Sequence, residues 1–195
     1  MKIRRFLSSL AAFAVVAGFL LQQGDVSAAS LTSQVQLLVK ADLTDTSGLV
    51  EARAPLVMQR ILTLASGDAA NEASVVWSDS RTIAASGSET LDFAGGGLTD
   101  PFGAAVAPAK IRAIVVSAAA GNTNDVVLGN DVNHVPILSD ATTTVTIQPG
   151  GIFVVTAPAL AGVAVTAGTG DIIAVANSGA GSSVTYSIVV LGTAS

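Results

Sequence analysis

The chain has 195 residues, a formal net charge of −5, one histidine and no cysteine. This length suits one domain, and a chain without cysteine must be stabilised by packing, by oligomerisation or by both. One histidine without cysteine nearly excludes a zinc site. Beyond residue 29 the basic residues are scattered, whereas phosphate-backbone binding needs a clustered positive surface. We therefore expect no nucleic-acid partner.

The N-terminus has the pattern of a targeting segment. Lys2, Arg4 and Arg5 precede an apolar stretch at residues 6–21, and small residues at Val26-Ser27-Ala28 resemble a cleavage site. The apolar stretch is shorter than the roughly 20 residues that span a bilayer. We predict an apolar helix within residues 1–29 that acts as a cleavable signal peptide; a retained anchor is the alternative. Without residues 1–29, six basic and 13 acidic residues remain, which is a net charge of −7.

The first half of the remaining chain alternates in the manner of β-strands. Residues 31–43 and 55–64 predict two strands, although the second also has a weak helical pattern. Further strands are expected at residues 73–78 and 81–84, on either side of a Ser-Asp-Ser turn, and at residues 89–93. Residues 94–108 are rich in Gly and Pro and predict a long loop, with Leu98 and Phe102 as apolar pegs.

The second half repeats strand and turn to the C-terminus. Residues 110–118 are the clearest alternating strand, with Lys110 and Arg112 on one face and Ile111, Ala113 and Val115 on the other. The remaining strands are expected at residues 125–129, 135–138, 143–148, 152–156, 164–170, 171–177 and 184–192. The spacing of these strands predicts an all-β, antiparallel two-sheet sandwich that resembles a jelly roll, and residues 30–195 are expected to form one such domain.

Candidate catalytic and metal-binding residues are few. His134 with Ser139 and Asp140 has the composition of a Ser–His–Asp site, but such neighbours arise by chance in a chain rich in Ser and Asp. Calcium would need a cluster of oxygen ligands, for which the best candidates are Asn122, Asn124, Asp125, Asn130 and Asp131. Residues of these types more often cap loops, so we predict no catalytic residue, no cofactor-binding residue and no metal ligand.

The aromatic and glutamate residues are interpreted as structural. Trp77 and Tyr186 are single members of their types, and a sugar-binding platform is the alternative to packing for both. We expect packing for both, and core positions for Phe93, Phe102 and Phe153. The glutamates that could form a glycosidase pair, Glu51, Glu72 and Glu89, lie in no setting that predicts desolvation.

Several segments resemble one family of proteins. These segments are residues 76–82, 91–96, 98–103, 110–114, 148–151, 164–171 and 184–190. Together they resemble small, uncharacterised tailed-phage and prophage proteins, β-sandwiches associated with the virion as capsid decoration or head fibres. The resemblance spans about residues 57–192 and implies a fold, and it supplies no catalytic residues.

From these observations we expect a non-enzymatic structural subunit that associates with itself through its sandwich faces. Its partners would be further copies of itself, with a trimer as one geometry, and capsid or other surface-assembly proteins. It would contact a membrane only through an uncleaved N-terminal segment. The signal predicts export to the periplasm, cell surface or extracellular space, and an uncleaved chain would belong to a virion. An exported lectin-like or adhesin-like binding module is the alternative function.

Overall fold

A computed structural model describes residues 30–45, 48, 52–95 and 97–195. The apolar helix expected within residues 1–29 lies outside the described residues. All regular structure in the described part is β-strand, which confirms the all-β class. The strands are β1 (Ser33–Asp45), β2 (Ala52–Ser66), β3 (Glu72–Ala73), β4 (Val75–Ile83), β5 (Ser88–Asp92), β6 (Lys110–Ala118), β7 (Val126–Gly129), β8 (Thr144–Ile147), β9 (Ile152–Thr156), β10 (Val163–Ala164), β11 (Ile172–Asn177) and β12 (Val184–Thr193).

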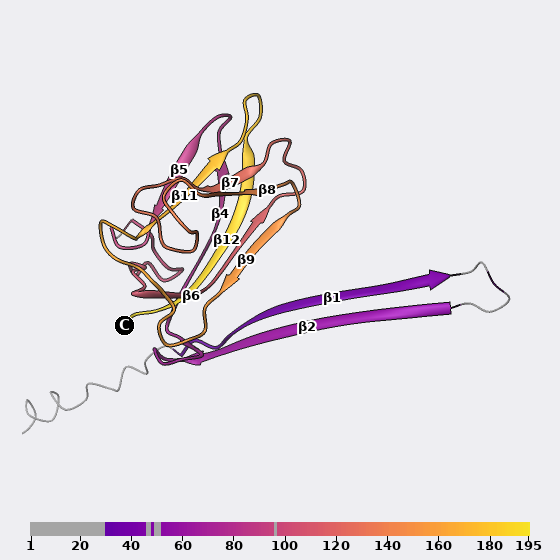
Figure 1. Cartoon of the computed structure of the whole chain (residues 1–195). Helices are drawn as coiled ribbons and strands as arrows, with labels where there is room; N and C mark the ends of the chain where they lie inside the picture. Colours follow the sequence, from indigo (N-terminus) through magenta and orange to yellow (C-terminus); the bar gives the residue numbers. More distant parts are fainter. Residues whose placement is uncertain (1–29, 46–47, 49–51, 96) are drawn as a thin grey trace, which may run out of the picture. The chain divides into compact units, whose positions relative to one another are not determined.

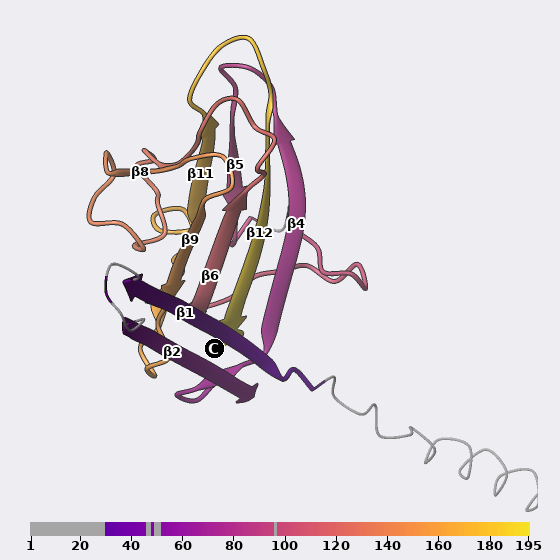
Figure 2. The same cartoon turned by 90° about the vertical axis from the view of Figure 1, so that its right-hand side faces the viewer.

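The strands after β3 form two antiparallel sheets, consistent with a β-sandwich (Figure 1). One sheet, the β6 sheet, has the order β4–β12–β6, and both β9 and β10 pair with the far edge of β6. The other sheet has the order β5–β11–β7–β8. Figure 2 shows β9, β6, β12 and β4 of the first sheet side by side.

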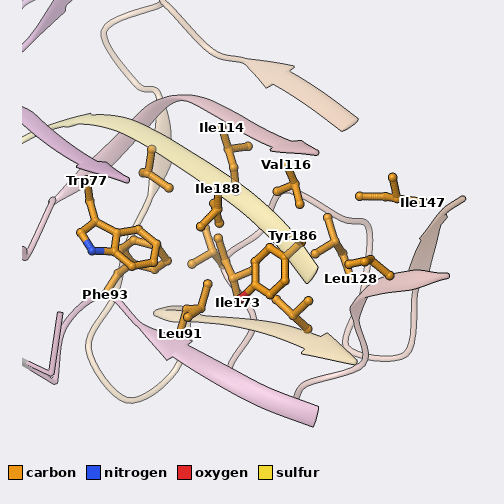
Figure 3. Packing of buried hydrophobic residues seen from close by; sticks show 14 of the residues in the cluster. Trp77, Leu91, Phe93, Ile114, Val116, Leu128, Ile147, Ile173, Tyr186 and Ile188 are labelled. Carbon is orange, nitrogen blue, oxygen red and sulfur yellow. The ribbon is translucent and has the colours of Figure 1, made fainter. Parts of the chain in front are cut away.

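The two sheets enclose the main hydrophobic core (Figure 3). Trp77 of β4 and Phe93 after β5 meet edge to face, with ring centroids 5.6 Å apart and an interplanar angle of 84°. Most of the other core residues are small and branched, as in Ile114, Val116 and Val175. Alternate residues of each strand supply this core, which is how a sandwich fills the space between its sheets.

The regular alternation expected in β6 is interrupted at Arg112. Ile111 belongs to the main core, but Ala113 lies on the outer face and Ile114 returns to the core. The ladder between β6 and β12 shifts register at Leu191 and Gly192, as in a β-bulge. A Cβ on Gly192 would lie 2.5 Å from the carbonyl oxygen of Lys110, so this close approach requires glycine. The prediction that Ile111, Ala113 and Val115 share a face was therefore wrong.

The turn predicted at Ser78-Asp79-Ser80 was also wrong, because β4 runs through it without a break. β4 is an edge strand, and its polar residues stay in the ladder opposite β12 while their side chains face solvent. Asp79 accepts a hydrogen bond from the amide of Ser80 and forms an ion pair with Arg81 at 2.8 Å. Charged side chains on an edge strand also discourage unwanted strand addition.

Three other expectations need correction. Residues 135–138 are not a strand, and the residue before them, His134, makes an isolated parallel bridge with Ile172. Of residues 164–170 only Ala164 belongs to a strand, the short β10, and a tight bridge joins Thr166 to Gly170. Phe102 is 92% exposed at the tip of its loop, whereas Phe93 is fully buried and Phe153 packs against the core as predicted.

Phe93 and Phe102 provide a direct test of this core. Phe93→Ala is expected to lower the free energy of unfolding by about 3–5 kcal/mol, because it empties a buried site beside Trp77. Phe102→Ala is the matched control, since truncating an exposed ring changes stability by about 0.5 kcal/mol or less. Urea unfolding followed by Trp77 fluorescence measures both, and equal effects would contradict the placement of Phe93.

Candidate interaction surface

The β1–β2 hairpin is called the arm from here on. Successive residues of each of its strands point to opposite faces. β1 and β2 pair antiparallel from Ser33 opposite Leu64 to Asp45 opposite Ala52. Paired residues share a face of the ribbon, so the register sorts the side chains into two sets. The apolar arm face contains Val35, Leu37, Val39, Ala41 and Leu43 from β1, and Ala54, Leu56, Met58, Arg60 and Leu62 from β2.

The opposite face of the arm is mixed in character. Lys40 lies opposite Val57, and Leu38 lies opposite Gln59. Asp42 forms an ion pair with Arg53 at 3.5 Å. This second face is therefore compatible with water, whereas the apolar arm face carries Arg60 as the one charged residue among the ten that define it.

The apolar arm face is covered at the base of the arm. Leu64 of β2 is fully buried in a small cluster with Ala73, Ala113 and Leu191, against which Leu31, Val35 and Leu62 are partly buried. Ala113 and Leu191 face outward from the β6 sheet, opposite each other in the ladder. Figure 2 shows β1 crossing in front of this sheet near the ends of its strands. The base of the arm is thus packed on the outer face of the sandwich.

Polar contacts hold the same junction. Arg112 is fully buried, and its guanidinium donates hydrogen bonds to the carbonyl oxygens of Ala159, Asp68 and Ala69. The Asp68 carboxylate accepts hydrogen bonds from Ser74, Ser195 and the amide of Ala194. The hydroxyl of Ser74, followed by that of Ser195, lowers the pKa of Asp68. These contacts tie the segment that follows β2 to β6 and to the C-terminal residues.

Beyond its base the arm has no cover within the described chain. Every described side chain from Gln36 to Thr44 and from Arg53 to Ile61 is exposed. On the apolar arm face Leu43 is 75% exposed, Leu56 57% and Leu37 52%. Large apolar side chains in a continuous exposed strip mark an interaction surface in soluble proteins.

A second exposed apolar surface lies on the β6 sheet beside the base of the arm. Val154, Val115 and Val189 face each other across the ladders from β9 to β6 to β12, and Ile152 flanks them on β9. Val154 is 46% exposed and Val189 38%. A cleft of about 370 Å³ separates this surface from the base of the arm, and it is lined by Ser33, Gln34, Val35, Gln36, Ala113, Val115, Val189 and Leu191. We call Ile152, Val154, Val115 and Val189 the outer-sheet patch.

The candidate catalytic residues do not form a triad. Nδ1 of His134 lies 3.1 Å from the carbonyl oxygen of Asp131. Ser139 shares a hydrogen bond with the hydroxyl of Thr143, and the Asp140 carboxylate accepts from Thr142 and from the amide of Thr143. No hydrogen bond among the described residues joins His134 to Ser139 or Asp140.

The candidate calcium ligands are engaged in loop structure. The side-chain amide of Asn122 exchanges hydrogen bonds with the backbone of Thr185. Asn124 donates to Asn177 and Ser182, and Asp131 accepts from the amide of Asn133. Asn130 adopts a positive φ of 64°, as asparagine often does in turns. The described residues contain no group of three or more His, Asp or Glu side chains placed to hold a metal.

Trp77 and Tyr186 lie in the core, as predicted. Trp77 is 3% exposed and Tyr186 is fully buried. The Tyr186 hydroxyl donates to Glu89 at 3.1 Å, and the other oxygen of Glu89 accepts from Arg81 at 2.6 Å. Burial, followed by the negative charge of Glu89, raises the pKa of Tyr186 above its ordinary value. Glu72 accepts from the amide of Ala69, and Glu51 lies outside the described residues.

Sequence reasoning identified the strands of the arm but not the arm itself. The signal was present in the alternation of apolar and polar residues that residues 33–45 and 52–66 share. Comparison with protein families, with curated proteins and with solved structures finds no match to this chain. No helix in the described part is long and apolar enough to span a membrane.

The single tyrosine allows a clean test of the Arg81–Glu89–Tyr186 cluster. Since the folded-state pKa of Tyr186 is raised, the phenol is expected to stay protonated in the folded protein above pH 10, where the unfolded chain ionises. The corresponding stability is present below pH 10 and is lost as the pH rises through the folded-state pKa. Absorbance at 295 nm follows the ionisation, and a midpoint near pH 10 in the folded protein would contradict this placement.

Asp140 provides a second test, at low pH. Hydrogen bonds from Thr142, and then from Thr143, lower its pKa to about 2. A lowered folded-state pKa means that the contribution of Asp140 to stability is present above its ordinary pKa near 4 and is lost as the pH falls toward 2. Thr142→Val should return the pKa of Asp140 toward the ordinary value in a carboxyl NMR titration, and an unchanged pKa would contradict the loop geometry.

Proposed function

We propose that this protein is a non-enzymatic structural subunit that associates with copies of itself. The apolar arm face carries this proposal, because it is a long, continuous strip of exposed apolar side chains. Removing apolar surface from water is the main driving force of association between proteins. A site for chemistry has less support, since the candidate catalytic residues are engaged separately in loop hydrogen bonds.

We also propose that the sandwich is a jelly roll. If β4, β5, β6, β7, β8, β9, β11 and β12 are counted as eight strands, one sheet has the order first–eighth–third–sixth, and the other second–seventh–fourth–fifth. This interleaving is the strand order of two Greek keys rolled into a pair of sheets. Jelly rolls occur in viral capsids and in lectins, so this fold agrees with an assembly subunit without specifying one.

The setting we propose for this subunit is the surface of a particle or a cell. The resemblance to phage decoration and head-fibre proteins favours the virion, and the targeting pattern of residues 1–29 favours export. We give the lectin-like alternative second place, because Trp77 and Tyr186, the two residues considered for a sugar-binding platform, are buried. We propose further copies of the chain as the partners, because each copy carries both the apolar arm face and the outer-sheet patch.

Sedimentation velocity over a wide range of protein concentrations tests this function. The full chain, recovered from its producer with its start point fixed by intact mass, is expected to sediment as an oligomer that resists dilution. Association should persist in high salt, because burial of apolar surface is not screened by ions. A monomer at every concentration would contradict the proposal.

A further inference from the structure

Both exposed apolar surfaces are formed by neighbouring antiparallel strands. The exposed part of the arm has nine residues in each strand, Gln36–Thr44 and Arg53–Ile61. At about 3.3 Å per residue and about 5 Å between strands, its apolar face is a strip roughly 30 Å long and 10 Å wide. The outer-sheet patch is also formed by neighbouring strands and presents Ile152, Val154 and Val189 to solvent.

The apolar arm face also continues directly from an interface that the chain already makes. At the base, Val35 and Leu62 of this face pack on Ala113 and Leu191 of the β6 sheet. The outer-sheet patch is the next part of the same sheet, reached across the cleft of about 370 Å³. At its base the arm therefore covers the outer face of the β6 sheet with apolar side chains. The neighbouring part of that sheet face, the outer-sheet patch, stays exposed.

Charge favours the arm as the connecting element between copies. Residues 31–66 carry three basic and three acidic residues, whereas residues 67–195 carry three basic and ten acidic residues. Direct contact between two sandwiches brings two acidic bodies together, which like-charge repulsion opposes. A neutral arm whose apolar face carries only the cation Arg60 meets no such opposition.

We propose that the apolar arm face of one copy lies on the outer-sheet patch of a second copy. This inference rests on the proposed self-association and names the surfaces that perform it. Each copy gives one arm and receives one, so reciprocal exchange between two copies is the smallest closed assembly. The exposed part of the arm offers roughly 300 Å² of apolar face per copy in projection, so two exchanged arms carry about 600 Å² of apolar face between them.

The first test compares adjacent residues of β2 in the full chain expressed in its native host. Leu56→Glu places a charge on the apolar arm face, and Val57→Glu places the same charge on the opposite face. Both side chains are more than half exposed, at 57% and 65%, so neither change disturbs the core. We expect Leu56→Glu to raise the dissociation constant of the assembly at least about tenfold, and Val57→Glu to change it by less than about threefold.

The second test uses the absence of cysteine from the sequence. Copies carrying Leu56→Cys are mixed with tagged copies carrying Val154→Cys and are oxidised mildly. The proposal predicts a disulfide between the two kinds of copy. Copies carrying Val57→Cys in place of Leu56→Cys should form little of this disulfide. Dominant cross-linking of Leu56→Cys to itself would mean that two arms pack face to face, and would overturn the proposal.

The possible outcomes distinguish a failure of the proposed self-association from a failure of the proposed arm contact. A wild-type chain that is monomeric at every concentration overturns both the self-association and the arm contact. A wild-type oligomer that Leu56→Glu leaves intact overturns the arm contact alone, and the structural function then stands on another surface. A circular dichroism spectrum of each variant that matches the wild type assigns a loss of assembly to the interface.

Discussion

The β1–β2 hairpin carries an apolar face that the chain itself covers only at the base. A ribbon of two strands has no second layer of its own, and an isolated hairpin is marginal in water. The base is secured by Leu64 in its cluster and by Arg112 beneath the adjoining loop. The rest of the face, including Leu37 and Leu56, has no such cover within the described chain.

The sandwich is suited to receive such an arm as well as to support it. Side chains such as Trp77, Phe93 and Tyr186 fill the space between its two sheets, so this core forms within one chain. The bulge at Arg112 and Gly192 turns Ala113 to the outside while it keeps Ile111 in the core. One irregularity in β6 thereby produces both the anchor of the arm and the start of the outer-sheet patch.

The sequence predicted the class of the fold well because period-two alternation is a local property. β6 matched its expected bounds at residues 110–118, and β5, β8, β9 and β12 lay close to theirs. The errors arose where tertiary structure overrides the local pattern. The edge strand β4 accommodates Ser78-Asp79-Ser80 without a turn. The bulge at Arg112 changes which face of β6 the following side chains occupy. The Phe102 ring lies at an exposed loop tip. Whether two neighbouring strands join a sandwich or form an arm depends on pairing, which alternation does not encode.

Hydrogen–deuterium exchange at low and high protein concentration tests the central claim, that a second copy covers the arm. The account predicts that amides of residues 36–44 and 53–61 exchange more slowly as concentration rises, together with those at the edge strand β9. Amides of β11, inside the opposite sheet, should not change. Exchange in the arm that is independent of concentration would contradict the claim, since it would mean that the apolar arm face has no partner among copies of this chain.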